Sequence, residues 1–244
     1  MKTKKIIKWL SAIVFCFSFV PGLQAAECVV LLHGLARGAG SMDVLDERLS
    51  AEGYTVINKA YPSREKSIEA LSRLAIDAAL DECRMQKAAP VNFVTHSMGG
   101  ILVRQYYAKN SIKGLNRVVM LGPPNGGSEI IDRMKEMPGF EKISGPAGQQ
   151  LRTDNEALPN ALGKVEFDLG VIAGTQSVNV FLSLLLPGED DGKVTVASAK
   201  VAGMNDFIAM PTTHPFMMKN TKVIDQVLSF LKTGKFFAKK TIKQ

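Results

Sequence analysis

Short apolar runs alternate along this chain with stretches of helical periodicity, and that alternation constrains the fold more than any other feature. Apolar residues fill most positions of the runs at 28–32, 91–95 and 117–121, which is typical of strands buried on both faces of a sheet. Further strands are expected at 54–58, 168–173 and 194–199, and helices at 42–52, 68–85, 101–107 and 223–231. Strands that alternate with helices predict an α/β fold, with a mostly parallel, twisted sheet and helices on both faces.

The length and composition suit one folded domain. The chain has 244 residues, of which 46% are hydrophobic and 22% charged, and this balance excludes a disordered or coiled-coil protein. One segment departs from the alternation. Residues 122–164 are rich in Gly, Pro, Asn and Met, have weak periodicity, and are too many for a simple crossover between strands. We therefore expect a small cap or lid insertion at 122–164, inside a domain that spans 26–235.

The first 25 residues have the pattern of a targeting segment. Lysines at positions 2, 4, 5 and 8 precede a short apolar stretch at 10–20, and Leu23-Gln24-Ala25 offers a small-residue cleavage site. This order is typical of a secretory signal peptide, and the alternative is an uncleaved N-terminal anchor. The sequence therefore favours an exported protein, periplasmic or secreted.

The positive charge of the chain belongs to its two ends. Removing residues 1–25, which hold four lysines and no acid, lowers the net charge from +7 to +3. The end of the chain from residue 232 holds five more lysines and no acid, so residues 26–231 carry −2. A nucleic-acid partner is therefore not indicated, because it would need a basic patch on the folded body. The basic tail at 236–244 is expected as a solvated extension or, alternatively, as a contact to an anionic membrane surface. The oligomeric state stays open.

One serine lies where a buried strand meets a helix. The segment 91–100 runs from the strand Val91–Thr95 through His96-Ser97-Met98 to Gly99-Gly100. It is close to the pattern G-x-S-x-G, in which a serine sits on a strained strand-to-helix turn and its neighbours two positions away must be small. Gly99 meets that demand, whereas Thr95 departs from the pattern and must pack tightly.

A second element complements this serine. The first strand ends in His33-Gly34-Leu35, a turn that can point the backbone N–H of Leu35 at a developing negative charge. The N–H of Met98, directly after the serine, would supply the second donor of an oxyanion hole.

These motifs together resemble a small bacterial lipase or esterase of the α/β-hydrolase superfamily. The matching segments span most of the chain after residue 26: 33–35, 95–100, 122–128, 191–194 and His214. The resemblance implies an α/β-hydrolase fold and a triad in the chain order Ser, Asp or Glu, His. Larger members bind calcium through an acid shortly after the histidine, but residues 215–219 hold no acid, so we expect no metal and no cofactor.

The histidine of the triad follows by elimination. The chain has three histidines. His96 is adjacent to Ser97, and neighbouring side chains at a strand end point to opposite faces. His33 belongs to the expected oxyanion turn, where a supporting role fits better. His214 therefore remains as the general base.

The acid should lie between Ser97 and His214 in a loop beyond a strand's carboxyl end. Asp191 precedes a glycine and fits the family pattern, so it is the expected acid, with Asp190 as the alternative. Asp168 and Asp206 open strands at the other edge, and Asp206 is the next candidate after these two.

Apolar residues surround the expected site. The run 178–187 lies before the acid loop and is either an acyl-chain wall or a buried element. Phe181 and Leu182 in this run, and Met217 beside His214, are the substrate-binding residues that we expect. Cys28 and Cys83 lie at the opposite edge of the sheet, on elements that the family places side by side. They form either a disulfide, as export would permit, or two buried thiols.

The sequence thus predicts an exported serine hydrolase that cleaves carboxylic esters of acyl lipids or small molecules. An acyltransferase or thioesterase with the same triad is the alternative within the enzymes. A non-catalytic binding protein on a hydrolase scaffold is the alternative outside them.

Overall fold

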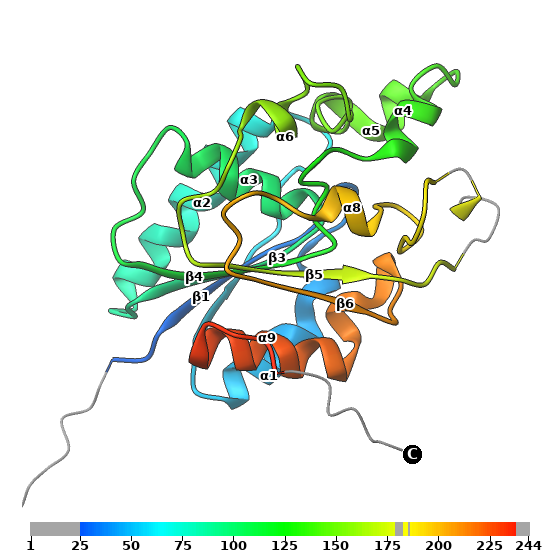
Figure 1. Cartoon of the computed structure of the whole chain (residues 1–244). Helices are drawn as coiled ribbons and strands as arrows, with labels where there is room; N and C mark the ends of the chain where they lie inside the picture. The colour runs from blue at the N-terminus through cyan, green and yellow to red at the C-terminus, as the bar shows by residue number, and fades with distance from the viewer. Residues whose placement is uncertain (1–24, 179–182, 185, 238–244) are drawn as a thin grey trace, which may run out of the picture.

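A six-stranded sheet forms the centre of the molecule (Figure 1). The structure is a computed structural model and describes residues 25–178, 183–184 and 186–237. All neighbouring strands pair in parallel, in the order β2-β1-β3-β4-β5-β6. The strands are β1 (Cys28–Leu32), β2 (Thr55–Asn58), β3 (Val91–His96), β4 (Leu115–Leu121), β5 (Leu169–Gly174) and β6 (Asp206–Met210). The prediction of a parallel sheet with flanking helices is confirmed.

Helices cover both faces of this sheet (Figure 1). On one face lie α2 (Ile68–Met85) and α3 (Met98–Tyr107), and on the other α1 (Asp43–Ala51), which follows the short helix η1 (Ala39–Met42), and α9 (Thr221–Thr233). Strand β1 shows why the run is apolar throughout: Val30 and Leu32 face the layer of α2 and α3, and Val29 and Leu31 face the layer of α1 and α9. Successive side chains of a strand point to opposite faces, so a strand between two helical layers must be apolar at every position.

The helix boundaries follow local signals. The hydroxyl of Ser67 accepts a hydrogen bond from the N–H of Ala70 at the start of α2, and the Asn220 side chain does the same for Lys222 at the start of α9. Gly53, just after α1, has a φ of +90° that favours glycine.

The strand expected at 194–199 is not formed, which corrects that prediction. These residues make a short helix, α8 (Val196–Ala199), and the place beside β5 is taken by β6. The hydroxyl of Thr195 accepts from the N–H of Ser198 and caps the helical turn. A short apolar run with a capping threonine and small residues fits a helical turn as well as a strand, so periodicity alone could not decide.

The segment 122–164 contains three short helices between β4 and β5: α4 (Glu129–Met134), α5 (Phe140–Gln149) and α6 (Leu158–Ala161). Arg104 of α3 fastens the ends of this segment. Its buried guanidinium donates to the carbonyl oxygens of Asn125, Pro159 and Gly163 and to the Asn125 side chain, at 2.7–3.1 Å. Burial lowers the Arg104 pKa to about 10. The action of the segment as a lid stays a prediction.

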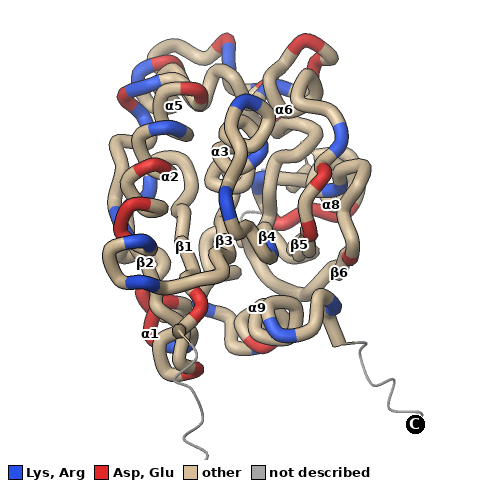
Figure 2. Tube along the Cα trace, turned by 90° about the vertical axis from the view of Figure 1, so that its left-hand side faces the viewer, with Lys and Arg blue, Asp and Glu red and all other residues tan. Residues whose placement is uncertain are grey.

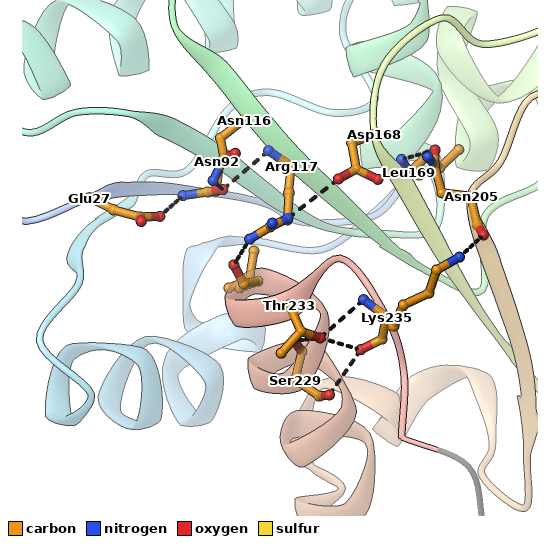
Figure 3. Close-up of polar contacts among 11 residues, drawn as sticks. Glu27, Asn92, Asn116, Arg117, Asp168, Leu169, Asn205, Ser229, Thr233 and Lys235 are labelled. Atoms are coloured by element: carbon orange, nitrogen blue, oxygen red, sulfur yellow. Dashed lines mark hydrogen bonds and ion pairs between the residues drawn. The ribbon is translucent and has the colours of Figure 1, made fainter.

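A polar network closes the amino edge of the sheet (Figure 3). The side chain of Asn92 donates to Glu27 at 2.8 Å and accepts from the side chain of Asn116 and the backbone of Arg117. Arg117 in turn contacts Asp168 at 3.3 Å and the last turn of α9. At the same edge a disulfide joins Cys28 at the start of β1 to Cys83 near the end of α2.

Acidic and basic residues are interspersed over the helices and loops, and most of the chain between them is uncharged (Figure 2). Residues 1–24 and 238–244, which hold most of the expected signal segment and the basic tail, lie outside the described residues. Among the helices in the described part, none has the length and apolar character needed to cross a membrane.

Candidate active site

Ser97 sits on a strained turn between β3 and α3. Its backbone has a φ of +55° and ψ of −125°, a conformation that is costly for a residue with a side chain. The close packing behind the turn explains its small neighbours. A Cβ on Gly99 would lie 2.5 Å from the Leu32 carbonyl oxygen, and one on Gly100 would lie 3.3 Å from the hydroxyl oxygen of Thr95. Thr95 fills the position where the usual pattern has glycine, and Gly100 supplies the space instead.

His214 reaches Ser97 from the other end of the chain. It opens the short helix η2 (His214–Lys219) after β6, and it is 7% exposed. Its Nε2 lies 3.0 Å from the hydroxyl oxygen of Ser97, and its Nδ1 lies 2.7 Å from Oδ2 of Asp191. The carboxylate can only accept, so Nδ1 carries the ring proton and Nε2 is free to accept from the serine hydroxyl.

Backbone groups near Asp191 hold its carboxylate in place. Its Oδ1 accepts from the backbone N–H groups of Lys193 and Val194 at 3.0 and 2.9 Å, while its carbonyl oxygen accepts from the N–H of His214. Two glycines at strand ends make room for the carboxylate. A Cβ on Gly122 would lie 2.8 Å from Oδ2 of Asp191, and one on Gly174 would lie 2.7 Å from its Cβ.

Asp190, the alternative acid, points elsewhere. Its Oδ1 accepts from the N–H of Gly192 at 2.7 Å, and its Oδ2 accepts from the hydroxyl of Ser183 at 2.5 Å. Asp190 is 4% exposed, so it is buried and stabilises the acid loop through these hydrogen bonds. Asp168 and Asp206 lie at the amino ends of their strands, as expected.

The turn after β1 packs directly against the serine. A Cβ on Gly34 would lie 3.0 Å from the Cβ of Ser97. Two residues further along the turn, the N–H of Ala36 donates to the buried hydroxyl of Ser63 at 3.0 Å. This hydrogen bond fixes the backbone directly after Leu35, whose own N–H is the expected oxyanion donor. Met98 is the first residue of α3, where N–H groups lack partners within the helix.

His33 stabilises the turn after β1 through its contacts with Gly34 and Tyr61. Its Nδ1 lies 3.0 Å from the Gly34 carbonyl oxygen, its Nε2 accepts from the N–H of Tyr61, and the two rings stack at 3.9 Å. The Tyr61 hydroxyl donates to the carbonyl oxygen of His33. Burial lowers the pKa of His33, so the ring is neutral in this role.

His96 contributes a contact that sequence reasoning missed. Its Nε2 donates to the carbonyl oxygen of His214 at 2.9 Å, and the two rings lie 4.7 Å apart. Its Nδ1 is buried and has no hydrogen-bond partner among the described residues. Burial, followed by the charge of His214, lowers the His96 pKa well below its ordinary value. The alternation of side chains along a strand argues against His96 as the base, but it does not reveal that this ring donates to the backbone of His214.

Comparison with known proteins rests on structure. No family model matches the sequence, and no curated protein matches it. Among solved structures, the mature lipase of Bacillus licheniformis aligns with a TM-score of 0.67 at 20% identity, over 86% of this chain and 92% of that one. The Pyrococcus furiosus esterase aligns with a TM-score of 0.59 at 16% identity, over 85% and 82%. A phospholipase of Legionella pneumophila gives 0.58 at 19% identity, and the match spans 72% of this chain but 46% of that one.

This chain has the α/β-hydrolase fold. The likeness and the six parallel strands with helices on both faces agree on that point. In an α/β-hydrolase the serine tops the sheet on a strand-to-helix turn, with the acid and the histidine following later in the chain. Ser97, Asp191 and His214 occupy those places in that order.

A pocket of about 360 Å³ opens over Ser97. Its apolar wall comes mainly from α4, from α5 and from the second residue after α5: Ile130, Ile131, Met134, Phe140, Ile143 and Leu151. The 122–164 segment thus lines the pocket. Volume and lining suit a small or medium-sized apolar ligand group.

Of the expected substrate-binding residues, Met217 is placed differently. It is fully buried among the apolar residues between the sheet and helices α1 and α9, and its sulfur would lie 2.9 Å from a Cβ on Gly122. Met217 therefore belongs to the core and does not line the pocket. Helix η2 turns Met217 inward and leaves Phe216 55% exposed. Phe181 and Leu182 lie outside the described residues. Val178, the described residue at the start of the 178–187 run, lines the pocket.

Metal binding finds no support in the described part of the molecule. No group of three or more His, Cys, Asp or Glu side chains that could hold an ion occurs among those residues.

Proposed function

We propose that this protein is an exported serine hydrolase that cleaves carboxylic esters, with acyl lipids as its substrates. One observation carries the proposal: the hydroxyl of Ser97 lies 3.0 Å from Nε2 of His214, whose Nδ1 lies 2.7 Å from Asp191. A nucleophile, a base and a group that orients the base are thereby in hydrogen-bond reach of one another. The lipase, esterase and phospholipase named among the structural neighbours support the same reaction class.

In the first step Ser97 attacks the ester carbonyl carbon while Nε2 of His214 takes the hydroxyl proton. The carbonyl π electrons move to oxygen, and the N–H groups of Leu35 and Met98 stabilise the resulting oxyanion. Preorganised backbone donors of this kind contribute ~10²–10³ in rate each. Electrons then return to re-form the carbonyl, the ester C–O bond breaks, and the imidazolium gives its proton to the departing alkoxide.

In the second step water attacks the acyl-enzyme by the same route, and the carboxylic acid leaves. Asp191 keeps the ring proton of His214 on Nδ1 and stabilises the imidazolium that forms twice per cycle. The hydrogen bond from His96 holds the backbone of His214, and the hydrogen bonds of Asp190 hold the acid loop.

The pocket supports acyl esters as substrates. Its deeper wall is apolar, and the exposed apolar side chains Ile143 and Val178 continue that surface outward. Export is proposed from residues 1–25 alone, which have the order of charges, apolar stretch and small residues of a signal peptide.

The test is a Ser97→Ala variant. We expect loss of p-nitrophenyl butyrate hydrolysis by several orders of magnitude and loss of labelling by a fluorophosphonate probe, with an unchanged melting temperature. Ser111→Ala, at an exposed serine before β4, is the matched control and should keep both. An activity loss below about tenfold for Ser97→Ala would remove the serine from the mechanism. Product analysis with added alcohols distinguishes hydrolysis from acyl transfer. Assays on thioesters distinguish ester cleavage from thioester cleavage.

A further inference from the structure

Two cationic side chains line the pocket beside the proposed catalytic groups. Arg37 follows the turn that holds Leu35, and Lys193 follows Asp191 by two residues. Both are exposed, and neither makes an ion pair or a side-chain hydrogen bond with another described residue. The residues outside the described part contain no Asp or Glu, so neither cation has an acidic side chain to neutralise it there.

The backbone fixes where these two charges lie. The N–H of Lys193 donates to Asp191 at 3.0 Å, and its carbonyl oxygen accepts from the hydroxyl of Ser128 at 2.9 Å. The N–H of Arg37 donates to the Gly34 carbonyl oxygen, and the preceding Ala36 is held by Ser63. Each cation therefore belongs to a loop that also positions a proposed catalytic group. The backbone of that loop is held in place, so the charge can move relative to the reacting atoms only as far as its own side chain reaches.

No accessible negative charge offsets them in the pocket. The one carboxylate in the described lining is Asp191, which is 1% exposed and is already bonded to His214 and to two backbone N–H groups. The charge of Arg37 also reaches inward, since it lowers the pKa of His96 after the larger effects of burial and His214. The part of the pocket around Arg37 and Lys193 is thus positive, whereas the wall from α4 and α5 is apolar.

We propose that Arg37 and Lys193 form an anion subsite, and that the preferred substrates are acyl esters whose alcohol portion carries a phosphate group. This inference rests on the proposed function and names its substrate class. The ester carbonyl must lie at Ser97, and the apolar wall of α4 and α5 takes the acyl chain. The alcohol portion then occupies the side that carries Arg37 and Lys193, where the phosphate monoester of a glycerol phosphate meets the two cations.

The experiment compares esters with one acyl chain and three alcohol portions: 1-decanoylglycerol, 1-decanoylglycerol 3-phosphate and 1-decanoylglycerophosphocholine, each below its micelle concentration. We expect the native enzyme to have its highest kcat/KM on the phosphate monoester. An exposed charge pair changes binding by up to about fivefold, so Arg37→Gln and Lys193→Gln should each raise KM for this substrate by about that factor, and the double variant by more. The ratio of phosphate-ester to neutral-ester kcat/KM should fall with added salt.

The matched control is Lys113→Gln, an exposed lysine before β4 at the far edge of the sheet, which should leave the substrate ratio unchanged. Equal native kcat/KM on the neutral and phosphate esters, or equal losses on both in the double variant, would overturn the anion subsite while hydrolysis itself stands. A preference for phosphocholine over the phosphate monoester would also overturn it as stated. Failure to hydrolyse any ester, together with no fluorophosphonate labelling, would overturn the proposed function and the subsite with it.

Discussion

At the scale of single residues, two adjacent aspartates have different partners. Asp191 faces His214, whereas Asp190 faces Ser183 and the N–H of Gly192. We expect Asp191→Asn to lower kcat/KM on a soluble ester by up to ~10⁴, because an amide cannot hold the ring proton on Nδ1. Asp190→Asn keeps one acceptor for the loop and should cost far less. A larger loss at Asp190 would reverse the assignment, and thermal melting of both variants serves as the folding control.

Two buried neutral histidines make the fold sensitive to mild acid. Burial lowers the pKa of both His33 and His96 in the folded chain, so below about pH 6.5 the unfolded chain binds more protons than the folded one. The contribution of these residues to stability is therefore complete above that pH and is lost as the pH falls. We expect the free energy of unfolding to drop between pH 6.5 and 5.5, with the larger share from His96, whose pKa is lowered well below its ordinary value.

Denaturant titrations at pH 7.5, 6.5 and 5.5 measure this dependence. The variant His96→Gln removes one of the two titrating groups, so its loss of stability over the same interval should be smaller than that of the native protein. A free energy of unfolding that stays constant from pH 7.5 to 5.5 would contradict the prediction.

At the scale of elements, the buried Arg104 joins α3 to both ends of the 122–164 segment. It donates to four oxygen atoms of that segment, and none of them is a carboxylate. We expect Arg104→Met to lower the free energy of unfolding by about 3 kcal/mol or more, because several buried carbonyl groups lose their donor together. Arg73→Met, at an exposed arginine on α2, should change it by less than about 0.5 kcal/mol.

Measurements of KM can distinguish whether Arg104 only stabilises the fold or also shapes the pocket. Because α4 and α5 form the apolar wall of the pocket, a loosened segment should raise KM for long-chain esters more than for acetate esters in Arg104→Met. Equal effects at all chain lengths would show that the arginine stabilises the fold without shaping the pocket.

The sequence allowed most elements to be predicted where one local signal dominates. The range of α2 follows from its periodicity and the capping Ser67, and the turn at Ser97 follows from the glycines that its close packing demands. Prediction failed at 194–199, where a capping threonine makes a helical turn from a run that also suits a strand. It failed at Met217, because the 3-10 helix that turns this side chain into the core has no distinct sequence pattern. The contacts of His96 and Arg104 join residues far apart in the chain, and no local pattern encodes them.

At the scale of the whole molecule, the carboxyl and amino edges of the sheet carry different groups of residues. The carboxyl edge carries Ser97, Asp191 and His214, with glycines and strained backbone around them. The amino edge carries the Asn92–Arg117 network and the disulfide between Cys28 and Cys83. A change confined to the amino edge should therefore alter stability and leave the chemistry intact.

The disulfide tests that separation. It closes a loop between residues 55 positions apart, which in the chain-entropy model stabilises the fold by about 4 kcal/mol. We expect Cys28→Ala/Cys83→Ala to lower the free energy of unfolding by that amount or slightly more, because two buried side chains also become smaller. Below its lowered melting temperature, the variant should keep the native kcat/KM on a short-chain ester.

Reductant provides the control that separates the bond from the side chains. It should lower the melting temperature of the native protein and leave that of the double variant unchanged, because only the native chain has a bond to break. Two titratable thiols in the denatured, unreduced native protein would show that the bond does not form. A fall in kcat/KM that accompanies the loss of stability would instead show that strain at the amino edge reaches Ser97 along β1 and β3, the paired strands that lead from Cys28 to the catalytic turn.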